Sequence, residues 1–433
     1  MDANAVAFIG FASLFALMLM RVPVGIAMGT VGVLGFGYMI GDIHPALKIL
    51  SQSPIRTATA AEFAVIPLFL LMGAFASASG MSRELFRAAN TFLGHLRGGL
   101  GVATIAACGG FAAICGSSVA TAATFSRVAY PEMRKFGYPQ SFATGVIAAG
   151  GSLGIMIPPS TVFAVYGLIT EQDIGKLFIA GIVPGIIAVG MYVITINIIA
   201  ALRPGFLPKT PRHSWAERME SVRDIWAVVL LFIFIIGGLY AGMFTATEAA
   251  GMGAAGAFII AVARRKLSRE DFWRCLVESL RTTAAVFTIL IGALIFGYFL
   301  TITQIPQKLT TFLTGLGIGP YGVLILIMLM YLVLGCIMDA MAMIILTVPI
   351  VFPVITTLGF DPIWFGVIIV MTVELGLIHP PVGMNVFVIK SVIREVKLST
   401  VFFGVMPFVL TDILRLAILI AFPVLATWLP SHM

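Results

Sequence analysis

Two glycine- and proline-rich stretches interrupt long apolar runs in this chain. Residues 150–160 read GGSLGIMIPPS, and residues 374–385 read ELGLIHPPVGMN. Proline lacks a backbone donor and clashes with the preceding helical turn, so neither Pro-Pro pair allows an unbroken helix. In hydrocarbon, a helix break is tolerated only where its free backbone groups face protein or water. We therefore interpret each break as a binding site. The alternative is a kink at which small residues let helices pack closely.

The composition places these breaks in a membrane. Sixty per cent of the 433 residues are hydrophobic and only 10% are charged, whereas soluble domains have about 25% charged residues. We predict an all-α polytopic membrane protein with on the order of ten spans. The first apolar stretch has no preceding basic region, so we expect a retained helix and not a signal peptide. The net charge of +7 comes from loop residues that set membrane topology, so no nucleic-acid partner is expected.

Four pairs of matching residues indicate an internal duplication. The Pro-Pro pairs at 158–159 and 380–381 are 222 residues apart, as are Gly137 and Gly359. Cys115 and Cys336 are 221 apart, and Pro184 and Pro407 are 223 apart. This order predicts a first repeat over residues 1–202, a linker over 203–224 and a second repeat over 225–433. Each repeat is expected to hold scaffold helices, a re-entrant hairpin (99–131; 320–357) and a broken helix (139–171; 362–393).

Within these units the apolar periodicity predicts finer divisions. The halves of the broken helices are expected at 139–151 and 160–171, and at 362–376 and 383–393. Surface helices are expected at 81–97 and 268–281, the latter followed by a separate helix at 283–301. A helix at 178–201 ends the first repeat, and one at 400–428 ends the second.

The distribution of basic residues predicts the topology. If both ends of the first hairpin are cytoplasmic, the inside receives 20 of the 26 Lys and Arg residues, and the outside receives only Lys48, Arg56, Lys176 and Lys308. This bias follows the positive-inside rule and places both termini in the periplasm. Each repeat then has an odd number of crossings, so the two repeats are inverted. Inverted repeats whose broken helices meet near the midplane are typical of secondary transporters.

The hairpin tips and the breaks supply the candidate binding groups. The first tip, 116–118, has two hydroxyls and faces a break that offers free carbonyls, which suit a hard cation such as Na⁺. The second tip carries Asp339 and faces a break with Thr372, Glu374 and His379. Ionisable groups at membrane depth are costly and are functional by default. Asp339 is a contact for ion or substrate or, equally, a helix cap, and Glu374 either joins this site or holds the loop shape.

Three further observations limit the chemistry. Asp412 and Arg415 are three residues apart on one helix and are expected to pair. Glu248 lies near a helix start and is expected to be an interface or packing group. The sequence has no Walker loop, no metal-spaced His/Cys set and no nucleophile elbow, so we expect neither ATP hydrolysis nor an organic cofactor.

At these motifs the chain resembles the large membrane subunit of TRAP (tripartite ATP-independent periplasmic) transporters. The residues that match lie at 110–118, 151–160, 244–250 and 374–383. The resemblance implies sodium-driven uptake of an organic acid across the bacterial inner membrane by an elevator movement. The acid would be a carboxylate such as a C4-dicarboxylate or a sialic acid-like molecule. A periplasmic substrate-binding protein would deliver it, and a small four-helix membrane subunit, here a separate chain, would complete the scaffold.

The resemblance also implies particular site residues. The first sodium site would be formed by Ala113, Gly116, Ser117, Gly154, Ile157 and Pro159. The second would be formed by Gly335, Gly376, His379 and Val382. Many relatives have Thr where this chain has His379, so its backbone carbonyl is the expected ligand. Substrate would lie between the tips, near Ser117, Ser118 and Asp339.

Two other functions fit parts of the sequence. One is a stand-alone ion/carboxylate exchanger of similar architecture, which would transport without a periplasmic partner. The other is an intramembrane enzyme that uses His379, Glu374 and Asp339. We expect no enzyme activity, because the sequence has no metal or nucleophile pattern and hence no catalytic residues to assign.

Overall fold

A computed structural model describes residues 2–336 and 338–433, and every regular element in these ranges is helical. Seven helical stretches in the described residues are long and apolar enough to cross a membrane, or eight if the bent pair 215–224 and 226–240 counts as one. The first ten α-helices are α1 (Ala3–Leu19), α2 (Val24–Ile40), α3 (His44–Thr59), α4 (Val65–Ala78), α5 (Met81–Leu93), α6 (Gly99–Cys115), α7 (Ser118–Lys135), α8 (Gln140–Met156), α9 (Thr161–Thr170) and α10 (Ile174–Leu202).

The second half of the chain has a similar order of helices. It contains α11 (Trp215–Asp224), α12 (Trp226–Tyr240), α13 (Ala246–Ala263), α14 (Arg269–Thr303), α15 (Ile305–Gly315), α16 (Gly319–Gly335), α17 (Ala340–Thr357), α18 (Pro362–Gly376), α19 (Met384–Val392), α20 (Leu398–Ala421) and α21 (Val424–Thr427). The starts of α7 and α17, and of α8 and α18, are each 222 residues apart. The expected hairpins therefore correspond to α6–α7 and α16–α17, and the expected broken helices to α8–α9 and α18–α19.

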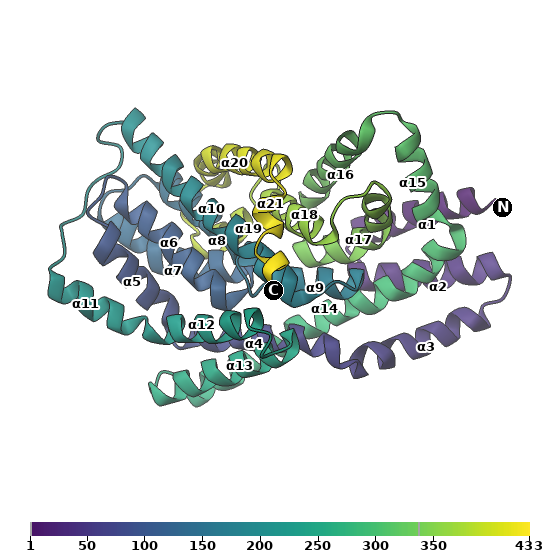
Figure 1. Ribbon diagram of the computed structural model, residues 1–433, viewed down its shortest axis with the longest axis horizontal. Helices are drawn as coiled ribbons and strands as arrows, with labels where there is room; N and C mark the ends of the chain where they lie inside the picture. Colours follow the sequence, from purple (N-terminus) through teal and green to yellow (C-terminus); the bar gives the residue numbers. More distant parts are fainter. Residues whose placement is uncertain (1, 337) are drawn as a thin grey trace.

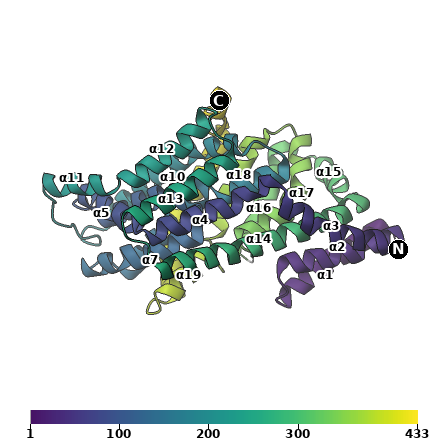
Figure 2. The same ribbon diagram turned by 90° about the horizontal axis from the view of Figure 1, so that it is seen from below.

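In Figure 1, α3, α4, α12 and α13 lie along the lower side of the view, and the hairpin and broken-helix elements α6–α8 and α16–α18 lie above them. Seen from below, α4, α13 and α14 run beside one another (Figure 2). The packing repeats between the two halves: α2 packs along α14 and α13 along α4, while α19 packs on α7 and α9 on α17. Each short half-helix thus rests on the return arm of the other half's hairpin.

The first break is shorter than the sequence suggested. We expected the first half-helix to end at residue 151, but α8 continues to Met156, so only residues 157–160 lie between α8 and α9. The glycines stay helical because other segments of the same protein pack closely against them. A Cβ at Gly150 would lie 2.7 Å from Cys108 Sγ, and one at Gly154 would lie 2.5 Å from the carbonyl oxygen of Ser117. The prolines, which lack a backbone donor, end the helix.

Other predicted boundaries were also wrong. The surface helix at 268–281 and the helix at 283–301 are one helix, α14, since residues 270–290 contain neither glycine nor proline. The first hairpin, expected to end at residue 131, continues through Pro131 to Lys135. The final helix, expected at 400–428, ends at Ala421 and is followed by the short α21.

The linker at 203–224 is partly helical. Its helix α11 begins with a capping box, in which Ser214 accepts from the Glu217 N–H and the Glu217 side chain accepts from the Ser214 N–H. Arg87 on α5 pairs with Glu220 and Asp224 of α11, each at 3.2 Å. These contacts hold the linker against the first repeat. A second capping box starts α13, with Thr245 as the N-cap and Glu248 as its partner in the first turn. Glu248 therefore belongs to the capping box.

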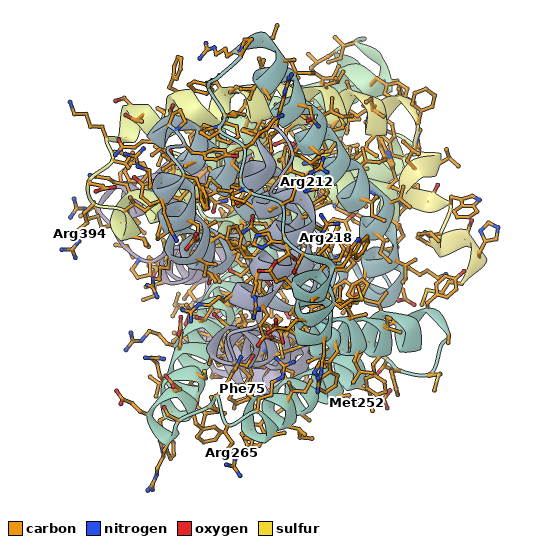
Figure 3. The ribbon with its side chains drawn as sticks, turned by 90° about the vertical axis from the view of Figure 1, so that its left-hand side faces the viewer. Phe75, Arg212, Arg218, Met252, Arg265 and Arg394 are labelled. Atoms are coloured by element: carbon orange, nitrogen blue, oxygen red, sulfur yellow. The ribbon has the colours of Figure 1, made fainter. Side chains whose placement is uncertain are left out.

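Several basic residues lie on the side of the molecule that carries α5 and α11. Figure 3 views this side and labels Arg212, Arg218, Arg265 and Arg394, which come from the linker, the turn after α13 and the turn after α19. Arg264, at the end of α13, lies 2.6 Å from Glu84 on α5.

The crossing of α2 and α14 depends on small residues. A Cβ at Gly292 would lie 2.0 Å from the carbonyl oxygen of Gly25, so the two backbones touch there. We expect Gly292→Ala to lower the free energy of unfolding by about 1–3 kcal/mol, the usual cost of overpacking. Thermal unfolding in detergent measures this. Gly297→Ala on the same helix is the control, because no described atom lies within 4 Å of its Cβ position. Equal stability of both variants would contradict the close crossing.

Candidate functional site: two hairpin tips and two helix breaks

The first tip ends one helix and starts the next within two residues. Gly116 has φ +62°, a left-handed conformation that favours glycine, and closes α6. Ser117 is the N-cap of α7, and its hydroxyl accepts from the Ala120 N–H at 3.4 Å. Ser118 is buried, whereas Ser117 is partly exposed. The positive end of the α7 dipole therefore points at the tip.

The first tip contacts the first break directly. A Cβ at Gly154 would be 2.5 Å from the Ser117 carbonyl oxygen, and one at Gly116 would be 2.8 Å from the Pro159 carbonyl oxygen. Thr161, in the first turn of α9, donates its hydroxyl to the Gly116 carbonyl at 3.0 Å. The structure thus brings together Gly116, Ser117, Gly154 and Pro159, which were predicted to share a sodium site.

The two other residues expected at this site contribute differently. Ala113 lies in the last turn of α6 and is buried. Ile157 directs its side chain toward α10, because a Cβ at Gly185 would lie 2.8 Å from Ile157 Cγ1. Only the backbone of Ile157 is therefore a candidate ligand.

The second tip and the second break also touch. A Cβ at Gly335 would lie 2.9 Å from Gly376 Cα, which leaves no room for a side chain. Cys336 Sγ lies 3.7 Å from the Pro380 carbonyl oxygen. His379 is half-buried, and its Nδ1 has no hydrogen-bond partner among the described residues. Val382 is 38% exposed, so this end of the break lies at the surface of the isolated chain.

Asp339 is the helix cap that the sequence left as one of two possibilities. Its Oδ1 accepts from the backbone N–H groups of Met341 at 3.0 Å and Ala342 at 3.1 Å, at the start of α17. Ser117 and Asp339 are thus the N-caps of the matching helices α7 and α17. They are 222 residues apart, one more than the spacing of 221 between Cys115 and Cys336. Asp339 is exposed, and within residues 2–336 and 338–433 no hydrogen bond joins it to Ser117 or Ser118.

Glu374 has its ion-pair partner on α20, outside the second tip and the second break. Its Oε2 is 2.8 Å from Arg415 Nη2 on α20, and both side chains are fully buried. The expected pair of Asp412 and Arg415 is present, with Asp412 Oδ1 3.0 Å from Arg415 Nη2. A residue 41 positions further along the chain therefore holds the Glu374 side chain, and the expected roles of Glu374 in the second site or in the loop shape stay predictions.

Three site residues escaped the sequence analysis. Thr121 donates to the Ser117 carbonyl at 2.8 Å, and Thr161 to the Gly116 carbonyl. Asn385, in the first turn of α19, is fully buried, and neither of its amide atoms has a hydrogen-bond partner in the described part of the chain. A common signal was available: each is a polar residue in the first turn of the helix that follows a tip or a break.

This arrangement can bind small ions of either sign. At the first contact between tip and break, backbone carbonyls and hydroxyls lie close together and exclude side chains, which provides oxygen ligands for a hard cation. Four helices start directly after the tips and breaks, namely α7, α9, α17 and α19. Helix N-termini attract anions such as carboxylates. Discontinuous helices that combine both features are the usual binding elements of secondary transporters.

The fold matches that of a solved membrane transporter. The YdaH transporter of Alcanivorax borkumensis superposes with a TM-score of 0.63, at 14% sequence identity, over 89% of each chain. The chain therefore shares the fold of that transporter.

The sequence defines the family. Residues 11–425 match the family described as "Tripartite ATP-independent periplasmic transporter, DctM component", and the chain belongs to this family. It is 39% identical to the C4-dicarboxylate TRAP transporter large permease protein of Pseudomonas aeruginosa, over 89% of this chain and 87% of that protein. It is 33% identical to the isethionate TRAP transporter permease protein DctMQ of Oleidesulfovibrio alaskensis, over 96% of this chain and 64% of that protein.

Proposed function

We propose that this chain is the translocating subunit of a sodium-coupled TRAP system that takes up an organic anion. The observation that carries the proposal is the contact between the first tip and the first break. There the carbonyls of Gly116, Ser117 and Pro159 lie beside Gly154 and the hydroxyls of Thr121 and Thr161. Such a set of neutral oxygens suits Na⁺.

We propose a second sodium site at the equivalent contact in the second repeat. Gly335 and Gly376 touch there, and the turn with His379 and Val382 follows. The backbone carbonyl of His379 is the proposed ligand. The two repeats are proposed to be inverted, so that one hairpin enters the membrane from each side, both termini are periplasmic, and an elevator movement carries the sites across the inner membrane.

The proposed substrate is a small carboxylate. A C4-dicarboxylate is the first candidate, because the alignment with the C4-dicarboxylate permease of Pseudomonas aeruginosa covers 87% of that protein. Its charge would be met by the N-termini of α7 and α17, beside Ser117, Ser118 and Asp339. The carboxylate of Asp339 repels an anion unless a cation lies between them, so bound Na⁺ would favour substrate binding.

The proposed partners are a small membrane subunit on a separate chain and a periplasmic substrate-binding protein. The isethionate relative supports the small membrane subunit. This chain spans 64% of that longer protein, whose name, DctMQ, refers to both membrane components. The family description, tripartite and periplasmic, supports the substrate-binding protein.

Reconstitution in proteoliposomes tests the proposal. We expect uptake of a radiolabelled C4-dicarboxylate only when a sodium gradient, the small subunit and the substrate-bound binding protein are all present. Replacing external Na⁺ with choline should abolish uptake, and collapsing the gradient with a sodium ionophore should do the same. Uptake driven by ATP without Na⁺ would contradict the proposal. Uptake by this chain alone would favour the stand-alone exchanger.

A further inference from the structure

Five polar side chains form a buried network between the two broken helices. They are Ser152 on α8, Tyr192 on α10, Glu374 on α18, and Asp412 and Arg415 on α20, and none is exposed. Ser152 Oγ lies 3.3 Å from the Tyr192 hydroxyl, which donates to Asp412 Oδ2 at 2.7 Å. Arg415 Nη2 then contacts Asp412 at 3.0 Å and Glu374 at 2.8 Å. The network is continuous from the first repeat to the second.

The network is built from equivalent positions of the two repeats. Ser152 and Glu374 are each twelve residues after the start of α8 and α18. Tyr192 and Arg415 are each eight residues after the matching prolines Pro184 and Pro407. The neutral pair Ser152–Tyr192 therefore corresponds to the charged pair Glu374–Arg415. Asp412 joins the two pairs, because it contacts both Tyr192 and Arg415.

Each end of the network is close to a break. Ser152 is two residues before Gly154, which contacts the first tip at Ser117. Glu374 is two residues before Gly376, which contacts the second tip at Gly335. A shift or rotation of either helix end would therefore move a member of the network. These five side chains have no exposed surface, and in such surroundings a change at one contact strongly affects its neighbours.

Arg415 also has unused hydrogen-bonding capacity. It contacts both carboxylates through Nη2, while its Nε and Nη1 and the Oε1 of Glu374 have no partner among the described residues. A guanidinium and a carboxylate can also pair through two parallel bonds. Such a two-bond pairing of Arg415 with Glu374 would be a second arrangement of the same groups, and a coupling element between two sites requires two arrangements.

We infer that this network couples the two breaks, so that occupation of one sodium site raises the affinity of the other. The inference rests on the proposed sodium sites. Ser152, Tyr192, Glu374, Asp412 and Arg415 are positioning residues here, because they act through Gly154 and Gly376 and do not touch the ion. Coupling of two sites gives a sigmoidal sodium dependence with a Hill coefficient between about 1 and 2.

Tyr192→Phe tests the inference, since it removes only the hydroxyl that joins Ser152 to Asp412. Initial uptake rates of the reconstituted three-component system are measured against sodium concentration. We expect a Hill coefficient clearly above 1 in the wild type and about 1 in Tyr192→Phe. Ser152→Ala should act in the same direction. Tyr138→Phe is the matched control, because its buried hydroxyl donates to the Pro208 carbonyl outside the network, and its Hill coefficient should equal that of the wild type.

The outcomes separate this inference from the proposed function. A wild type without sodium dependence overturns the proposed function and the coupling together. A sodium-dependent wild type whose Hill coefficient is 1, or is unchanged in both Tyr192→Phe and Ser152→Ala, overturns the coupling alone. A fall in the maximal rate with an unchanged Hill coefficient indicates a structural role and also overturns it. If Tyr192→Phe does not fold, Ser152→Ala decides the question.

Discussion

Gly154→Ala is expected to raise strongly the sodium concentration that gives half-maximal uptake. The new Cβ would lie 2.5 Å from the Ser117 carbonyl oxygen and 2.8 Å from Thr121 Oγ1. It would push the tip away from the break and separate the proposed ligands. Overpacking of this kind costs about 1–3 kcal/mol, which corresponds to about a 5- to 150-fold loss of sodium affinity. The half-saturating sodium concentration for uptake measures the effect.

Gly190→Ala is the matched control. Gly190 lies on α10, and no described atom is within 4 Å of its Cβ position, so its sodium dependence should be that of the wild type. If Gly154→Ala has the same half-saturating concentration as Gly190→Ala, then the first tip and break do not form a sodium site.

Arg415→Met is expected to be the most destabilising substitution in the buried network. It removes the cation that lies between Glu374 and Asp412 and leaves two buried carboxylates without a counter-charge. Removal of one partner from a buried ion pair costs about 3–5 kcal/mol. The free energy of unfolding in detergent measures the loss.

Removing all three charges together should restore much of that stability. The triple variant Glu374→Leu, Asp412→Leu, Arg415→Met buries no charge, and apolar replacements of buried ion pairs are often close to neutral. If the free energy of unfolding of Arg415→Met alone is within about 1 kcal/mol of the wild-type value, then Arg415 does not hold the two carboxylates. A triple variant less stable than the single one would show that the charges themselves are needed for folding.

The sequence predicted the architecture well where one strong local signal was present. The Pro-Pro pairs predicted both helix breaks, and the spacing of about 222 residues predicted the matching hairpins and broken helices in each half. Asp412 and Arg415 were predicted to pair from their spacing on one helix. In each case the determining interaction is local, or it is repeated within the chain.

The errors arose where tertiary contacts decide the outcome. Glycines from 150 to 154 suggested a long break, but close packing on Cys108 and Ser117 keeps them helical. Glu374 was assigned to the nearest break, whereas its partner, Arg415, lies on another helix. Asn385 and Thr161 have no distinctive motif, so only their positions in first turns after breaks could have indicated them.

Sodium binding by the purified chain tests the central claim, that the contacts between tips and breaks are sodium sites. A ligand that binds only the folded state raises stability by RT ln(1 + [L]/Kd), about 2.7 kcal/mol at a hundredfold excess over Kd. We predict that Na⁺, compared with choline at equal ionic strength, raises the unfolding temperature of the wild type and of Gly190→Ala, and that Gly154→Ala shows a smaller rise. Equal unfolding temperatures of the wild type in Na⁺ and in choline would contradict the claim.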